Sequence, residues 1–276
     1  MKINQSIINL SSQILGASIF CLTTFVPSAY SQTLTENSAY YTKPNAVDSQ
    51  QFPSLVSDIA KQVTVRIFTD NSAGSGVIIK QVGNTYTLVT NNHVIENNST
   101  KLYPVMTGDG ITHQATLVST PQIAHLDMAI LQFTSDRPYQ VVEIADSNQL
   151  SVGENVFAAG FPNWHQPDSY KMSSTRAWGS QAFQLTSGSV QMLPSRTLTQ
   201  GYQLGYTNDI KSGMSGGPMF NNRGQLIGIN GRSKYPIAGM GAFNFADGSQ
   251  PSIEQFKKME SLSWGIPAHK ILLTKS

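Results

Sequence analysis

The chain has 276 residues, which allows one or two domains with a core large enough to fold without disulfide bonds. Its formal net charge is only +2, and its Lys and Arg residues form neither a run nor a basic patch interleaved with aromatic residues, which excludes nucleic acid as a partner. Charged residues make up 12% of the sequence while Ser, Thr, Asn, Gln and Gly are abundant, which favours a β-rich protein outside the cytoplasm over a helical cytosolic one.

Residues 1–31 are predicted to be an export signal. Lys2 supplies a short positive region, residues 14–26 are mainly apolar, and residues 29–31 (Ala-Tyr-Ser) have the small-x-small form of a cleavage site before Gln32. An uncleaved membrane anchor is the alternative, but threonines and a proline interrupt the apolar run, which falls short of the roughly 20 residues that span a bilayer. We therefore expect an exported protein, periplasmic or secreted, with no stable membrane insertion after cleavage.

The only cysteine, Cys21, lies inside this signal, so the mature chain is expected to contain no thiol. That excludes disulfides, a catalytic cysteine and a thiolate metal site. Four histidines form no His/Glu cluster at metal-ligand spacing, which argues against a zinc hydrolase; they are His113, His125, His165 and His269. We expect no bound metal and no organic cofactor.

After the signal, residues 32–53 are polar with few large apolar groups and are predicted to form a flexible leader or linker. From Ser54 the apolar pattern changes, and residues 54–148 are expected to form a first domain. A helical turn leads into a strand near Val65, and a turn at Gly83-Asn84 separates two more strands. These two strands cover 74–79 and 86–90, and further strands are expected at 115–119, 128–133 and 141–144. Short strands separated by Gly, Asp, Pro and Ser clusters are typical of an all-β barrel or sandwich.

A polar stretch with turn formers at 146–153 marks the expected boundary, so residues 149–276 form the second domain. Its expected strands cover 155–160, 183–185, 187–192, 203–206, 219–220, 226–229 and 242–244. Residues 252–262 have apolar residues at three-residue spacing with charged residues between them, which predicts an amphipathic helix near the C-terminus.

Three segments carry residues suited to nucleophilic catalysis. Glycines flank Ser215 within residues 211–218 and leave its hydroxyl and the nearby N–H groups free to approach a reacting carbonyl. A serine nucleophile needs a base, and His93 follows an apolar run in the segment Thr-Asn-Asn-His-Val. Asp127 opens another apolar run, Asp-Met-Ala-Ile-Leu. Each segment alone could equally be a surface turn or a structural strand end.

Together, in the order His, Asp, Ser, these segments resemble the three catalytic blocks of trypsin-like serine proteases and are most similar to the bacterial HtrA-type branch. The resemblance extends from about Ile59 to about Leu273 and is specific around the three blocks. It implies an all-β fold of two six-stranded β-barrels, with the active site in the cleft between them and a short C-terminal helix. HtrA-type relatives usually carry a peptide-binding PDZ domain after the protease, and we expect none in this sequence.

The resemblance implies acyl transfer, with His93 and Asp127 from the first barrel and Ser215 from the second. Ser215 attacks a peptide carbonyl, His93 takes and returns the proton, and Asp127 orients the histidine. The N–H groups of Gly213 and Ser215 form the oxyanion hole. Two other aspartates are disfavoured as the partner of the histidine. Asp109 lies between glycines in a turn, and Asp136 follows its apolar strand instead of preceding it.

The sequence says less about substrate specificity than about the catalytic residues. Met214 replaces the aspartate with which animal digestive enzymes bind a new N-terminus, so that activation switch is absent. Asp209 lies six residues before the serine, where trypsin-like enzymes place the carboxylate that binds Lys or Arg, but it could equally cap a local turn. Residues 228–231 are expected to form a strand edge that pairs with substrate backbone, with Ile229, Asn230 and Gly231 as substrate-binding residues.

The sequence therefore predicts a serine endopeptidase with polypeptide substrates, and leaves the natural substrate and the oligomeric state open. A non-catalytic, protease-like peptide-binding protein is the alternative, although a decayed enzyme would be expected to have lost one of the three residues or a flanking glycine. Residues 213–217 also fit the Gly-x-Ser-x-Gly elbow of esterases. The order of the three residues and the shortage of helices do not fit that class.

Overall fold

We describe the protein from a computed structural model, in which residues 51–70, 72–168 and 170–275 are described. The predicted export signal and the leader up to residue 50 lie outside these residues. Helix α1 (Gln51–Val63) begins at the last three positions of the predicted leader. Val56, Ala60 and Val63 are buried, because their spacing places them on the face of the helix that packs against the core.

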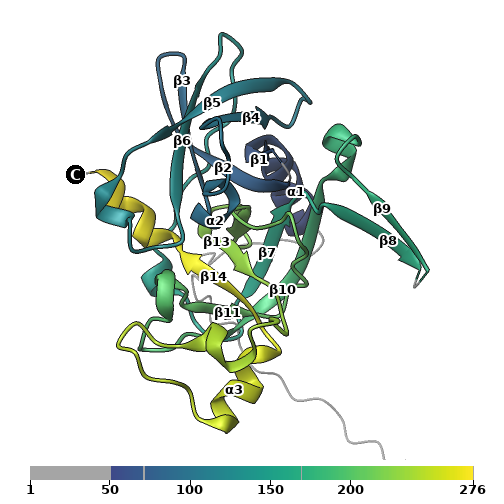
Figure 1. Ribbon diagram of the computed structural model, residues 1–276. Coiled ribbons are helices and arrows are strands. Elements are labelled where there is room, and N and C mark those ends of the chain that lie inside the picture. Colours follow the sequence, from purple (N-terminus) through teal and green to yellow (C-terminus); the bar gives the residue numbers. More distant parts are fainter. Residues whose placement is uncertain (1–50, 71, 169, 276) are drawn as a thin grey trace, which may run out of the picture. The chain divides into compact units, whose positions relative to one another are not determined.

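The first half of the described chain forms a closed barrel of six antiparallel strands in the order β1-β2-β3-β6-β5-β4 (Figure 1). The strands are β1 (Thr64–Phe68), β2 (Ala73–Val82), β3 (Thr85–Thr90), β4 (Leu102–Met106), β5 (Thr112–Val118) and β6 (Ala129–Thr134). The β2–β3 hairpin turns at Gly83 with a φ of 58°, a conformation that glycine adopts without strain, as the Gly-Asn pair predicted. Alternate side chains point inward, among them Val65, Ile67 and Leu88.

The second half forms another closed barrel, in the order β10-β11-β14-β13-β12-β7 (Figure 1). Its strands are β7 (Asn155–Gly160), β10 (Gln184–Met192), β11 (Leu204–Tyr206), β12 (Pro218–Phe220), β13 (Leu226–Arg232) and β14 (Ser263–Pro267). Two closed six-stranded barrels with few helices confirm the predicted fold class. The exact domain boundary at residue 149 stays a prediction.

Several expected strands differ in the structure. Residues 141–144 form no strand; Val142 donates its N–H to the carbonyl of Ile78, and Ile144 makes a single parallel bridge with Leu226. Residues 242–244 belong to or follow a 3-10 helix rather than a strand, and the two strands expected at 183–192 are one continuous strand, β10. The hairpin of β8 (Trp164–Asp168) and β9 (Lys171–Ser174) was not predicted. Its exposed side chains lack the alternating burial on which strand prediction depends.

Helices connect the strands or close the barrels. The expected C-terminal helix is α3 (Ile253–Glu260), which begins with a capping box in which Ser252 Oγ accepts the N–H of Gln255. The other helices are α2 (Asn92–Ile95), η1 (Pro121–Ile123), η2 (Ser147–Gln149), η3 (Gly179–Ala182), η4 (Thr199–Gly201), η5 (Gly239–Phe243) and η6 (Ala268–Lys275). Across the described ranges, no helix combines the length and apolar character that crossing a bilayer requires.

Buried polar contacts join the barrels near the loop that carries Ser215. Ser75 on β2 is fully buried, and its N–H donates to the carbonyl of Ser215 at 2.9 Å. Arg66 on β1 is also fully buried and donates to the carbonyl and hydroxyl oxygens of Thr175 at 2.8 and 2.9 Å. Because the acceptors of these three hydrogen bonds lie on the other half of the chain, the bonds help to fix how the two barrels meet.

Candidate active site

His93 and Asp127 lie side by side because their strands are neighbours. His93 is on α2, directly after β3, and Asp127 comes just before β6; the β3–β6 register pairs Thr90 with Ala129. Asp127 Oδ1 accepts the backbone N–H of His93 at 2.9 Å, and Oδ2 lies 2.6 Å from His93 Nδ1. A carboxylate oxygen only accepts, so Nδ1 carries the proton and Nε2 is left as the basic nitrogen.

The carboxylate of Asp127 is held ionised in a buried place. Its side chain is only 4% exposed, and burial by itself raises the pKa of the carboxyl group. Hydrogen bonding and the positive charge of His93, together with donation by the Tyr202 hydroxyl, outweigh burial and bring the pKa below its usual range. A charged acceptor therefore faces the histidine at neutral pH.

This lowered pKa predicts acid-sensitive stability. A depressed folded pKa stabilises the native state fully above the unfolded value, about 4 for Asp, and the contribution is lost as the pH falls through the folded value. We expect the free energy of unfolding of the wild type to exceed that of Asp127→Asn at neutral pH, and the gap to narrow below about pH 4. Urea unfolding of both proteins between acid and neutral pH measures the gap; a constant gap would contradict the prediction.

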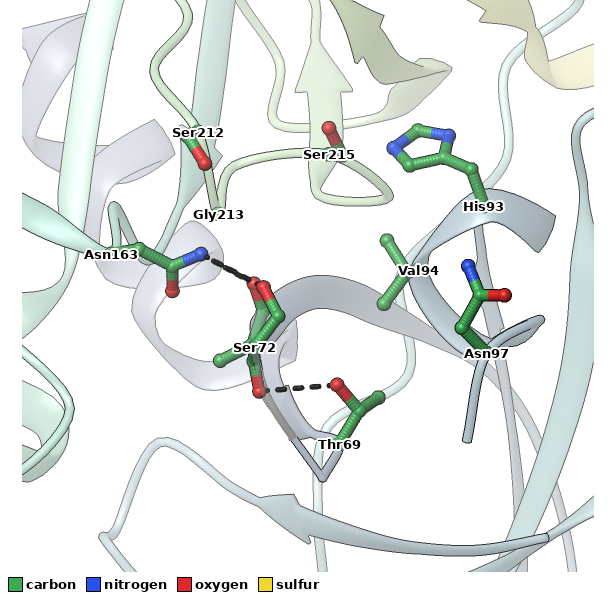
Figure 2. Close-up of a pocket in the computed structure, with 10 residues that line it drawn as sticks. Thr69, Ser72, His93, Val94, Asn97, Asn163, Ser212, Gly213 and Ser215 are labelled. Atoms are coloured by element: carbon green, nitrogen blue, oxygen red, sulfur yellow. Dashed lines mark hydrogen bonds between the residues drawn. The ribbon is translucent and has the colours of Figure 1, made fainter. Parts of the chain in front are cut away.

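Ser215 reaches the site from the second barrel, on the loop between β11 and β12. Its half-buried hydroxyl donates a long hydrogen bond of 3.4 Å to the carbonyl of Gly231. Ser215 and His93 line one cavity of about 310 Å³, and Figure 2 shows the imidazole ring turned toward the serine hydroxyl. Within the described residues no hydrogen bond joins the two side chains. Contacts of this kind are often long in unliganded sites and tighten around substrate.

The backbone next to Ser215 presents two N–H groups. Gly213 has a φ of 98°, and the carbonyl of Ser212 accepts the N–H of Asn163 at 2.8 Å. Since C=O and N–H of one peptide point in opposite directions, this bond turns the Gly213 N–H away from Asn163. In the described part of the chain the N–H groups of Gly213 and Ser215 meet no backbone or side-chain acceptor. They remain available to a ligand oxygen.

Ser75 braces the same loop from the first barrel. Besides the bond to Ser215, its hydroxyl donates to the carbonyl of Gly213 at 2.8 Å and accepts the N–H of Phe161 at 2.8 Å. Sequence reasoning missed Ser75, Asn163 and Tyr202, because each acts on a segment far away in the chain. The only signal was the Gly-Ser-Gly string around Ser75, in which small residues permit close backbone approach.

The predicted substrate-binding residues are not gathered in the cavity. Asp209 is exposed between the buried Asn208 and Ile210, and it is not among the residues that line the cavity beside Ser215. Ile229 is part of the core, and the Asn230 side chain is buried, accepting from Tyr206 and donating to the carbonyl of Ala159.

The strand edge expected at 228–231 differs in the structure. Strand β13 lies between β12 and β14, and both the N–H and the carbonyl of Asn230 are bonded to the Ser215 loop. Ile229 and Asn230 therefore offer no open edge, because neighbouring segments occupy both sides. Gly231 lies at the bulge where the β13–β14 register shifts, and its carbonyl faces Ser215. It is the one of the three residues that borders the site.

No group of three or more His, Asp or Glu residues that could hold a metal ion occurs in the described part of the chain. The polar atoms around the cavity are hydroxyl, amide and imidazole groups. The arrangement offers a hydroxyl, a basic imidazole supported by a carboxylate, and two free N–H groups, which is the equipment of acyl transfer.

Comparisons with known proteins agree with this chemistry. Residues 74–229 match the family model described as trypsin-like peptidase domain. The chain is 32% identical to "Serine protease Do-like HtrA" of Bacillus subtilis over 59% of its length and 34% of the relative's. It is 32% identical to "Probable periplasmic serine endoprotease DegP-like" of Pseudomonas putida, over 70% of its length and 37% of the relative's. The chain thus spans little more than a third of these relatives.

Proposed function

Because the chain belongs to the trypsin-like peptidase family, with relatives of the HtrA type, we propose that it is a serine endopeptidase that hydrolyses polypeptides. The observation that carries the proposal is the cavity shared by His93 and Ser215, with Asp127 bonded behind the histidine. The three side chains come from three different segments of the chain, α2, the residues before β6 and the loop between β11 and β12.

In the proposed reaction, Ser215 Oγ forms a bond to the carbonyl carbon of the substrate while its proton passes to His93 Nε2. The N–H groups of Gly213 and Ser215 bind the negative carbonyl oxygen. The tetrahedral intermediate expels the amine, which takes the proton from His93, and leaves an ester on Ser215. Water, which gives a proton to His93, attacks the ester carbon; the bond to Ser215 Oγ breaks, the carboxylic acid product leaves, and His93 returns the proton to Ser215 Oγ. Asp127 keeps the imidazole in the required tautomer throughout.

Covalent labelling tests the proposal. An organic fluorophosphonate should modify Ser215 in the full chain, releasing fluoride, and unfolded casein should slow the labelling. Ser72→Ala is the matched control, since the Ser72 hydroxyl lines the same cavity; this variant should be labelled, and Ser215→Ala should not. Peptide binding without labelling would instead support a non-catalytic peptide-binding protein, and labelling of Ser72 in place of Ser215 would reject the assignment.

Ser75→Ala is expected to lower both activity and stability. It leaves the Gly213 carbonyl and the Phe161 N–H without their partner, which costs about 1–3 kcal/mol of unfolding free energy, and it loosens the loop that presents the oxyanion N–H groups. We expect kcat for casein to fall about 10-fold. Ser147→Ala is a control, because Ser147 is also a buried serine but bonds to His269, and neither residue lines the cavity beside Ser215. An equal loss of kcat in both variants would contradict the prediction.

Several relatives are named as periplasmic enzymes, including those of Pseudomonas putida and Rickettsia prowazekii. With the predicted signal at 1–31, we propose that this protein also acts outside the cytoplasm. N-terminal sequencing of the exported protein should begin at Gln32. The preference for Lys or Arg before the cut, based on Asp209, stays a prediction; sequencing the new termini of cleaved casein tests it.

A further inference from the structure

Tyr202 is a third donor to the carboxylate of Asp127, and it comes from the other barrel. It directly follows η4 in the second barrel and is 1% exposed. Its hydroxyl donates to Asp127 Oδ2, the same oxygen that lies 2.6 Å from His93 Nδ1. Asp127 also donates its own N–H to the carbonyl of Gln200 at 2.9 Å, so the η4 segment holds both its backbone and its side chain.

Two residues on β13 determine the position of the Tyr202 side chain. A Cβ atom at Gly231 would lie 2.3 Å from the Tyr202 hydroxyl oxygen, so only glycine leaves room for the ring to reach the carboxylate. The Arg232 guanidinium lies over the Tyr202 ring, 4.1 Å from its centroid, a cation–π contact. Arg232 is fixed by hydrogen bonds to Gln200 Oε1 at 2.9 Å and to the carbonyl of Ala242.

On the basis of the proposed endopeptidase function, we propose that Tyr202, with Arg232 stacked on its ring, is a positioning residue. It holds the Asp127 carboxylate toward His93 and withdraws part of the negative charge of that carboxylate. The tyrosine binds no substrate; it acts through the carboxylate. Tyr202 and Ser215 belong to the second barrel, whereas Asp127 belongs to the first. The Tyr202–Asp127 bond therefore also couples the orientation of the histidine to the docking of the two barrels.

Burial and a neighbouring negative charge keep the Tyr202 hydroxyl protonated, so that it always donates. Burial, and then the negative charge of Asp127, raise the pKa of Tyr202 well above its usual range, so it stays protonated at any working pH. The other titratable groups that face this cluster are His93 on α2, Arg232 on β13, Tyr206 on β11, and Lys270 on η6, whose Nζ donates to the carbonyl of Gly201 at 3.0 Å.

Removing the donor has two distinct effects. In Tyr202→Phe the carboxylate keeps more of its charge, which favours the imidazolium form of the histidine and moves the acidic limb of the pH profile of kcat/KM upward, by about half a pH unit. The carboxylate also loses a fixed orientation, which we expect to lower kcat about 10-fold while leaving KM unchanged. A purely structural role would not move the pH profile.

The test uses the full chain, with casein cleavage measured from pH 5 to 9, and Tyr206→Phe as the matched control. Tyr206 is also fully buried and donates to a side chain, Asn230 Oδ1, but not to Asp127. We expect the acidic limb to move in Tyr202→Phe and to stay in Tyr206→Phe. Coinciding profiles for wild type and Tyr202→Phe, or equal shifts in both variants, would overturn the inference.

A second measurement does not depend on proteolysis. The low-field proton resonance of His93 Nδ1–H should shift in Tyr202→Phe and remain unchanged in Tyr206→Phe, and Arg232→Gln should move it in the same direction as Tyr202→Phe by a smaller amount. If the wild type cleaves no casein but the resonance behaves in this way, the proposed function fails and the positioning role stands. An active wild type with an unmoved resonance rejects the positioning role alone.

Discussion

Replacing Ser215 by Ala is expected to lower kcat for casein cleavage by about 10⁶-fold, the loss found when the nucleophile of a Ser-His-Asp enzyme is removed. The proposed chemistry begins with a bond from Ser215 Oγ, and Ser215 lines the same cavity as His93 and Gly213. Residual cleavage would reflect binding and oxyanion stabilisation alone. The appearance of new casein termini over time, at saturating substrate, measures the loss.

The fold should be unaffected by this change. Among the described residues, Ser215 Oγ makes one long hydrogen bond, at 3.4 Å to the carbonyl of Gly231, while backbone groups of the loop make its other contacts, including those to Ser75. We therefore expect the Tm of Ser215→Ala to stay close to that of the wild type. Undiminished casein cleavage by a folded Ser215→Ala protein would contradict the assignment of Ser215 as the nucleophile. Ser72→Ala is the control, because it removes another hydroxyl group from the same cavity and should leave kcat unchanged.

Asp127→Asn is expected to lower kcat by about 10⁴-fold at neutral pH. The amide group of Asn can donate where the carboxylate only accepts, so it favours the His93 tautomer with the proton on Nε2, which cannot act as the base. The second cause is electrostatic, because the neutral side chain no longer stabilises the imidazolium that forms in the transition state. Casein cleavage by the purified variant, with folding checked by circular dichroism, measures the effect.

Asp136→Asn is the matched control for this charge removal. Asp136 was one of the two competing aspartates in the sequence; in the structure it is exposed and accepts from the side chain of Asn84. Its replacement should leave kcat unchanged. The double variant Ser215→Ala/Asp127→Asn should be no slower than Ser215→Ala, since residues that act as one unit are not additive. A further 10⁴-fold loss in the double variant would show that Asp127 does not act through the serine.

The local sequence predicted most of the fold. Alternating apolar residues, punctuated by Gly-Asn and similar pairs, located strands such as β3 and β7 and the hairpin turn at Gly83. Errors arose where burial and backbone pairing do not follow periodicity. Val141, Val142 and Ile144 are apolar because they pack on the core although they form no strand, and the exposed β8–β9 hairpin has no buried face to produce a pattern.

The sequence by itself predicted the fold class and nominated His93, Asp127 and Ser215, because three segments in the order His, Asp, Ser resemble the catalytic blocks of trypsin-like serine proteases. In these segments glycines flank the serine, and each partner lies next to an apolar run. Only the tertiary structure decided what surrounds them. Tyr202 stands 75 residues from Asp127 and Ser75 stands 138 residues from Gly213, yet each donates directly to its partner. Such contacts depend on how two closed barrels dock, and docking is set by burial across distant segments, which leaves no periodic signal in the chain.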